Sequence, residues 1–167
     1  LSKILIEAKK KDIITVLDLV SNNDPTFQKV VLSALPNTDY LLLNEIEAEL
    51  LFKRPIINSK KKLNKKLITN LSKKLFLKGI KKALIIHHAK ESLYLSRDEV
   101  IHTNSQTINK RKIINSVGAG DAFCAAFIYG IHESWDIKKT LKKAHAAGST
   151  MMKVDSSSGN LPNIQKL

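Results

Sequence analysis

Short apolar runs alternate with longer amphipathic segments along the chain. The runs 13–17, 40–43 and 83–86 are apolar on both faces, which is typical of strands inside a parallel sheet. Apolar residues at helical spacing predict helices at about 1–11, 25–35, 44–51, 60–77, 121–133 and 137–153. This alternation predicts an α/β layered fold, in which helices flank a mostly parallel sheet and residues 1–167 form one domain.

Three further segments complete this expectation. Residues 92–95 and 100–103 are shorter and more polar, and they are interpreted as antiparallel additions to the sheet. Residues 112–114 are predicted to form the last strand, directly before a glycine-rich turn, and 155–167 are predicted to be loop.

In parallel sheets, ligands bind outside the carboxyl ends of the strands. Polar side chains stand at the ends of the three apolar runs: Asp18, Asn44, His87 and His88. The two histidines are neighbours in one strand and point to opposite faces, which argues against a joint zinc site.

The glycine turn at 115–123 runs straight into an apolar helix. Glycine permits a close backbone approach, and the first N–H groups of a helix attract anions, so the turn is a candidate anion site. Asp121 lies in the first turn of that helix. Two interpretations stay open from the residues alone: a structural aspartate that suits the helix dipole, or a general base beside a bound phosphate. The turn lacks the Gly-Lys-Ser/Thr of a Walker A loop and the spacing of Gly-x-Gly-x-x-Gly.

A second candidate pair follows the second apolar run. Asn44 and Glu47 are three residues apart, so they share one face of the first helical turn. One interpretation is a capping box, in which Asn44 caps the helix and Glu47 reaches back to it. The other is a Mg²⁺ site, since Mg²⁺ keeps several waters and needs few carboxylates.

Composition narrows the classes of function. The 167 residues carry a net charge of +13, mostly from lysine, but aromatic residues make up only 5% and no zinc pattern occurs. Few arginines and no aromatic stacking platform argue against a nucleic-acid partner. Cys124 is the only cysteine and falls on an apolar helix face, so it is interpreted as a small core residue. No apolar run reaches membrane-spanning length, and a cytoplasmic, non-membrane protein is expected.

The string 117–123 resembles the C-terminal signature of the ribokinase (PfkB) family of sugar and nucleoside kinases. The resemblance implies a ribokinase-like fold, with Asp121 as the base that deprotonates the acceptor hydroxyl. It also implies an anion hole at Gly118, Ala119 and Gly120, where the N–H groups of residues 119–121 face the transferring γ-phosphoryl group. Asn44 and Glu47 fit the family's Asn-x-x-Glu motif, which favours the metal role: Glu47 would hold Mg²⁺ through water, and ATP is the implied cosubstrate.

Two further positions carry expectations from the same resemblance. His145 stands where many members have an asparagine near adenine, so it joins Asn44 and Gly120 as a nucleotide-binding candidate. A histidine packed between helices is the alternative. Asn115 replaces a common aspartate whose backbone carbonyl helps to bind a monovalent cation, so K⁺ dependence is left open. Asp18 matches the start of a family motif that the following residues do not continue.

The sequence also departs from the family pattern. Residues 87–92 lack both glycines of the family's Thr-x-Gly-x-x-Gly loop, at Ala89 and Ser92. The resemblance covers only the C-terminal half of a family member, without the N-terminal substrate half and lid. The leading hypothesis is therefore an ATP-dependent kinase of sugar or nucleoside hydroxyls, of which this chain is a C-terminal portion. The alternative is a nucleotide-binding or regulatory remnant without turnover; the acceptor, a second chain and a homo-oligomer are left open.

Overall fold

A computed structural model describes residues 1–21, 24–105, 110–155 and 162–167. The chain divides into two compact units, 1–88 with 93–101, and 89–92 with 102–167. The first unit contains the helices α1 (Ser2–Lys10), α2 (Phe27–Ala34), α3 (Glu45–Phe52) and α4 (Lys65–Leu77). Its strands are β1 (Val16–Asp18), β2 (Tyr40–Asn44) and β3 (Ala83–His88). The second unit contains α5 (Ala119–His132) and α6 (Ile137–Met151).

The predicted α/β architecture is confirmed. The sheet order is β1-β2-β3-β4-β5, where β4 is Glu91–Leu95 and β5 is Val100–Asn104. Strands β1, β2 and β3 are parallel neighbours. Ser96 N donates to Glu99 O and Ser105 N to Lys90 O, which closes the two ends of a β4–β5 hairpin. The hairpin therefore extends the sheet, with β4 beside β3 and β5 at the edge.

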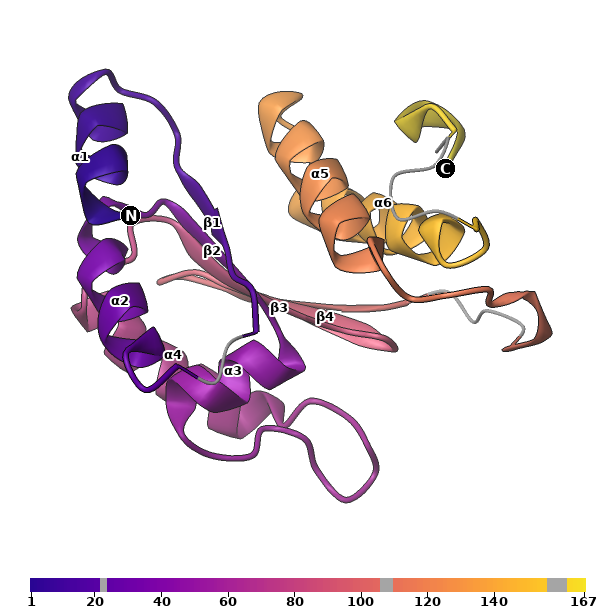
Figure 1. The fold of residues 1–167 in the computed structure, drawn as a ribbon, viewed down its shortest axis with the longest axis horizontal. Coiled ribbons are helices and arrows are strands. Elements are labelled where there is room, and N and C mark those ends of the chain that lie inside the picture. The colour runs from indigo at the N-terminus through magenta and orange to yellow at the C-terminus, as the bar shows by residue number, and fades with distance from the viewer. Residues whose placement is uncertain (22–23, 106–109, 156–161) are drawn as a thin grey trace. The chain divides into compact units, whose positions relative to one another are not determined.

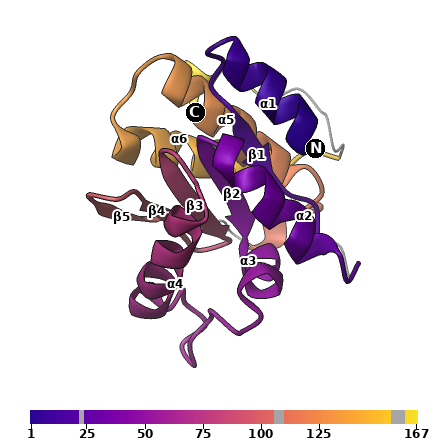
Figure 2. The ribbon, with the colours of Figure 1, turned by 90° about the vertical axis from the view of Figure 1, so that its left-hand side faces the viewer.

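One apolar cluster holds the first unit together. Alternate residues of the strands share one face, and those in this cluster are Leu17, Leu41, Leu43, Leu84, Ile86, Leu93 and Leu95. Helices α1 to α4 supply the facing side chains, and these helices gather along one face of the strands (Figures 1 and 2). This packing fixes where the carboxyl ends of β1, β2 and β3 lie.

The strand predicted at 13–17 is shorter than expected. Ile13 and Ile14 are about half exposed, and β1 begins only at Val16. The chain turns at Asp12, which has a positive φ of 53°, and Ile13 N donates to Ala8 O. The two isoleucines therefore lie in the connection between α1 and β1 rather than in the sheet.

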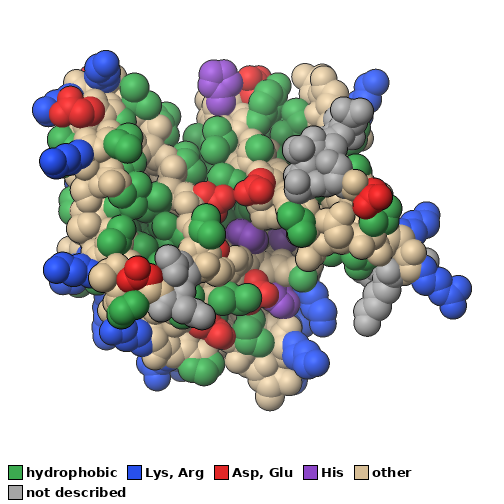
Figure 3. Space-filling view, viewed as in Figure 1, with side chains coloured by type: hydrophobic (Ala, Val, Ile, Leu, Met, Phe, Trp, Pro, Cys, Tyr) green, Lys and Arg blue, Asp and Glu red, His purple; other side chains and the backbone are tan. Residues whose placement is uncertain are grey.

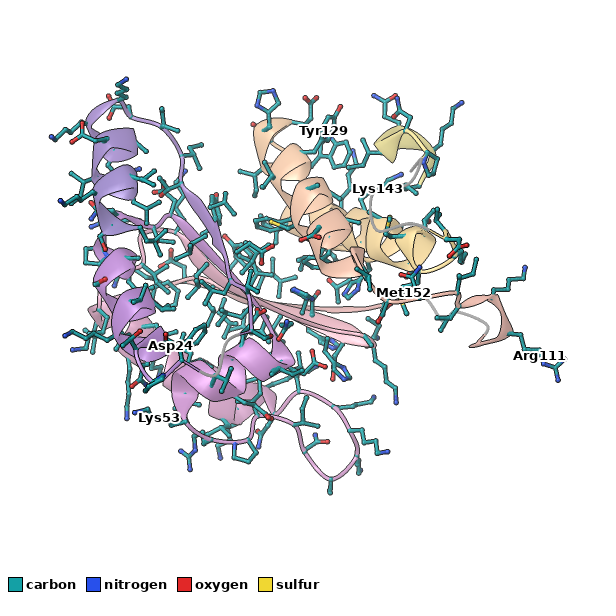
Figure 4. All side chains as sticks on the ribbon, viewed as in Figure 1. Asp24, Lys53, Arg111, Tyr129, Lys143 and Met152 are labelled. Atoms are coloured by element: carbon teal, nitrogen blue, oxygen red, sulfur yellow. The ribbon has the colours of Figure 1, made fainter. Side chains whose placement is uncertain are left out.

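The predicted strand at 112–114 is wrong. A 3-10 helix, η2 (Lys110–Lys112), occupies its start, and Ile114 makes a single backbone bond to Met152 O at 2.9 Å. In Figure 4, Met152 lies at the end of α6, beside the chain that leads to α5. Helix α4 also begins later than predicted, because Asn64 caps it by accepting from Leu67 N. Of the predicted loop at 155–167, residues 156–161 lie outside the described part, and η3 (Ile164–Lys166) is a short 3-10 helix.

The surface agrees with a dispersed lysine charge. Figure 3 shows lysine and arginine side chains scattered along the outer edges of the face in view, without one continuous basic patch. Within the ranges described above, every helix is too short or too polar to cross a bilayer.

Candidate functional site

The glycine turn contains one residue in the left-handed backbone conformation, and α5 begins directly after it. Gly118 has a φ of 78°, a conformation that residues with a Cβ rarely adopt, and it is the N-cap of α5. The helix begins at Ala119, two residues before the predicted start. Asp121 is exposed in the first helical turn. The predicted base therefore stands beside the N-terminus of a helix of 14 residues.

The predicted anion hole has two open donors. Ala119 N donates to Ser116 O at 3.3 Å, and Ala122 N donates to Gly118 O at 2.9 Å. In the described part of the chain, no acceptor is found for the N–H groups of Gly120 and Asp121. The first N–H groups of a helix have no intrahelical partner and carry its positive dipole end. These two groups are thus available to an anion, whereas the Ala119 N–H already has a long hydrogen bond.

Asn115 anchors the entry to this turn. Its Nδ2 donates to Val154 O at 3.0 Å, and its Oδ1 accepts from Val117 N at 2.9 Å. Both ends of the amide are therefore engaged within the protein. Any cation role falls to the backbone carbonyl, as the resemblance implies.

Asn44 and Glu47 form a complete capping box at the start of α3. Glu47 N donates to Asn44 Oδ1, and Asn44 N donates to Glu47 Oε2, both at 2.9 Å. Asn44 Nδ2 and Ser21 Oγ also donate to Glu47 Oε1. The capping interpretation is thus present in the structure, and both carboxylate oxygens of Glu47 already accept hydrogen bonds.

Glu47 is buried, which changes its acidity. Burial is the largest cause that raises the pKa of Glu47, and the charge of Asp18 acts in the same direction. Hydrogen bonds from Asn44 and Ser21 oppose the rise. A nearby cation would favour the charged form of this carboxylate.

The carboxyl ends of the parallel strands meet as predicted. Asn44 pairs with His87 across β2 and β3, and Asp18 pairs with Leu42 across β1 and β2. Polar side chains that are distant in the sequence therefore converge on one edge of the first unit. No group of three metal-binding side chains is found among the described residues.

His145 is a buried residue of the second unit. Its exposed fraction is 6%, and its Nε2 lies 3.0 Å from Ser92 Oγ. Its ring packs edge-on against the ring of Phe123, with the two ring centroids 5.2 Å apart. Burial, followed by the charge of His102, lowers the pKa of His145 to about 4. The imidazole is therefore neutral at pH 7. The surroundings of His145 match the alternative of a histidine packed between helices. Its contact with a nucleotide stays a prediction.

Comparisons with known proteins show the family to which the chain belongs. The model of the pfkB family of carbohydrate kinases matches residues 2–164. The chain belongs to this family. It is 32% identical over 91 residues to a 5-dehydro-2-deoxygluconokinase of Clostridium botulinum, which covers 52% of this chain and 25% of that protein. It is 26% identical over 150 residues to a deoxyribokinase of Salmonella typhi, which covers 90% of this chain and 46% of the relative.

A solved structure supports the fold. The ribokinase of Arabidopsis thaliana, complexed with ribose and ATP, superposes with a TM-score of 0.74 at 23% identity. The superposition covers 93% of this chain and 46% of that one. The chain thus spans about half the length, or less, of the PfkB kinases to which it is similar.

Three long-range contacts near the site residues were not predicted from the sequence. Ser92 contacts His145, Glu91 pairs with His102 at 2.7 Å, and Gly148 lies against Ala119. The first contact had a signal. Ser92 replaces a glycine of the family pattern, and His145 replaces an asparagine. Two residues that both depart from one pattern are candidates for a direct contact, in which each satisfies a polar group of the other. Nothing comparable in the sequence marked the other two.

Proposed function

We propose that this chain carries the catalytic and nucleotide side of a PfkB kinase, which transfers the γ-phosphoryl group of ATP to a hydroxyl of a sugar or nucleoside. The observation that carries the proposal is the N-terminus of α5. There the Asp121 carboxylate and the open backbone N–H groups of Gly120 and Asp121 occur in the same helical turn. Phosphoryl transfer depends mainly on positioning and electrostatic stabilisation, and this turn offers both.

Each residue of the turn has a part in the proposal. Asp121 accepts the proton of the acceptor hydroxyl as the oxygen attacks phosphorus. The N–H groups of Ala119, Gly120 and Asp121 stabilise charge on the transferring group, and those of Gly120 and Asp121 have no described hydrogen bond to break first. Asp121 has no described hydrogen bond that would have to break first. The carboxylate is therefore available to a hydroxyl.

The capping box suits Mg²⁺ through water. Glu47 Oε2 accepts from Asn44 N and Glu47 Oε1 from Asn44 Nδ2, and a metal-bound water can donate to these oxygens without breaking either hydrogen bond. Mg²⁺ usually keeps several waters, which fits this arrangement. Mg²⁺ held there by Glu47 through water would neutralise charge on the ATP phosphates.

A monovalent cation is a separate part of the proposal. The Asn115 amide holds the backbone in a fixed turn, which leaves the carbonyl of Asn115 as a ligand for K⁺. The activity of the native protein in KCl and in NaCl at equal ionic strength tests this part. Equal activity in both salts would refute it.

The test of the main proposal replaces the base. In the native protein with ATP, Mg²⁺ and a panel of sugars and nucleosides, Asp121→Asn keeps the shape but cannot take the proton. We expect kcat to fall by about 10²–10⁴-fold, with the KM for ATP nearly unchanged. Glu133→Gln, at an exposed carboxylate that follows the other end of α5, is the control and keeps full activity. Normal turnover of Asp121→Asn would refute the proposed base.

A nucleotide-binding remnant without turnover is the second candidate. It is favoured by Ser92, which replaces a family glycine, is fully buried and is bonded to His145. Such a side chain takes space that the glycine leaves open. ATP binding by the wild-type protein without phosphoryl transfer to any member of the panel would decide for the remnant.

A further inference from the structure

Helix α6 approaches the backbone of the anion turn more closely than a side chain permits. A Cβ added to Gly148 would lie 2.9 Å from Ala119 O and 3.9 Å from the Cβ of Phe123. Contacts below 3.0 Å are essentially absent for real Cβ atoms, and the opposing atom is backbone. Only a glycine at this position lets α6 rest directly on the first residue of α5.

The end of α6 also holds the chain that enters the turn. Ile114 N donates to Met152 O at 2.9 Å, and Asn115 Nδ2 donates to Val154 O at 3.0 Å. Residues 148–154 thus contact the turn on both sides of Gly118. The bonds of Ile114 and Asn115 lie before Gly118 in the chain, and the contact of Gly148 with Ala119 lies after it. We call residues 148–154 the α6 platform.

A second glycine lies in the same helix pair, away from the turn. A Cβ added to Gly130 would lie 2.6 Å from Cγ2 and 2.7 Å from Oγ1 of Thr140. Gly130 is near the C-terminal end of α5, and Thr140 is in the first turn of α6, where its Oγ1 donates to Asp136 O. The two glycines therefore pose similar packing problems, but only Gly148 touches the turn.

We propose that Gly148 and the α6 platform position the anion turn, so that the N–H groups of Gly120 and Asp121 and the Asp121 carboxylate face the transferring phosphoryl group. This inference rests on the proposed kinase function. Donors act best at about 2.7–3.1 Å from the charge they stabilise, and a misplacement of about 1 Å can cost roughly 10²-fold in rate. Gly148 does not touch substrate in this account; it is a positioning residue.

The test compares Gly148→Ala with Gly130→Ala in the native protein. Both add one methyl group to the α5–α6 contact, so both are expected to lower the melting temperature. Only Gly148→Ala is expected to lower kcat, by about 10–100-fold, while the KM for ATP changes less than threefold. It should also weaken binding of ADP with Mg²⁺ and aluminium fluoride, a mimic of the transition state, more than binding of ATP.

The outcomes separate the inference from the function on which it rests. If the wild-type protein transfers no phosphoryl group, the proposed function fails and the inference falls with it. If the wild type is active and Gly148→Ala keeps its kcat, or if Gly130→Ala loses kcat equally, only the inference is overturned. Should Gly148→Ala not fold, Asn115→Ala cuts another platform contact without adding volume. The same selective loss of kcat then supports the platform, and an unchanged kcat refutes it.

Discussion

His145 and Ser92 form a buried hydrogen bond, with Nε2 and Oγ 3.0 Å apart and exposed fractions of 6% and 0%. They stand 53 positions apart in the chain. The contact joins α6 to the start of β4 within the second unit, and Phe123 of α5 packs against the same ring. Two departures from the family pattern thus become one structural contact.

The titration of His145 should make stability depend on pH. Its folded pKa, about 4, lies below the ordinary value of 6.5, so between these values the unfolded chain binds more protons. The free energy of unfolding should therefore fall as the pH drops from about 6.5 to 4, by up to roughly 3 kcal/mol from this group. Urea unfolding at several pH values measures it. His145→Gln should flatten the slope, and an identical slope in the variant would contradict this account.

Removal of the Ser92 hydroxyl should destabilise the second unit. Ser92→Ala leaves the His145 Nε2 buried without this partner, which should cost about 1–3 kcal/mol of unfolding free energy. Ser33→Ala, at an exposed serine of α2, is the control and should change it by less than about 0.5 kcal/mol. Chemical denaturation of both variants provides the comparison; equal effects would mean that the buried bond contributes nothing specific.

Glu47 should contribute to pH dependence in the opposite direction. The pKa of Glu47 in the folded chain is raised above the ordinary value of 4.5, so the folded chain binds the proton more strongly than the unfolded chain does. The free energy of unfolding therefore falls as the pH rises from 4.5 through the folded pKa. Glu47→Gln removes this contribution, so unfolding free energy should rise more steeply with pH than in the wild type. Glu47→Ala keeps the Asn44 cap but leaves Asn44 N without its acceptor, Glu47 Oε2, and should cost about 1–3 kcal/mol. Unfolding curves of the three proteins at pH 4–7 distinguish the two effects.

Gly79 should not tolerate a side chain. Its φ is 118°, and an added Cβ would lie 2.8 Å from the Cα of Pro36. Gly79→Ala should therefore lower the free energy of unfolding by about 1–3 kcal/mol, as expected for a strained backbone. Lys78→Ala, at the preceding exposed residue with a right-handed backbone, is the matched control and should have little effect. Thermal unfolding of the two variants checks this; equal melting temperatures would contradict the strain.

The apolar runs predicted β2 and β3 well because both faces of these strands are buried, so every residue of the run had to be apolar. The same reasoning failed at Ile13, Ile14 and residues 112–114. β-branched residues also occur in connections, and local periodicity cannot show whether a neighbouring strand is present. The backbone bonds to Ala8 O and Met152 O decide these segments.

The sequence by itself determined the order of the helices and of the three parallel strands, the glycine turn at 118–121 and the Asn44/Glu47 pair, because each depends on residues close together in the chain. Only the tertiary structure decided that Ser21 donates to Glu47, that Ser92 meets His145, and that Gly148 rests on Ala119. Burial and packing fix these contacts. They depend on which helix faces lie against each other, and that is a property of the fold rather than of any local pattern.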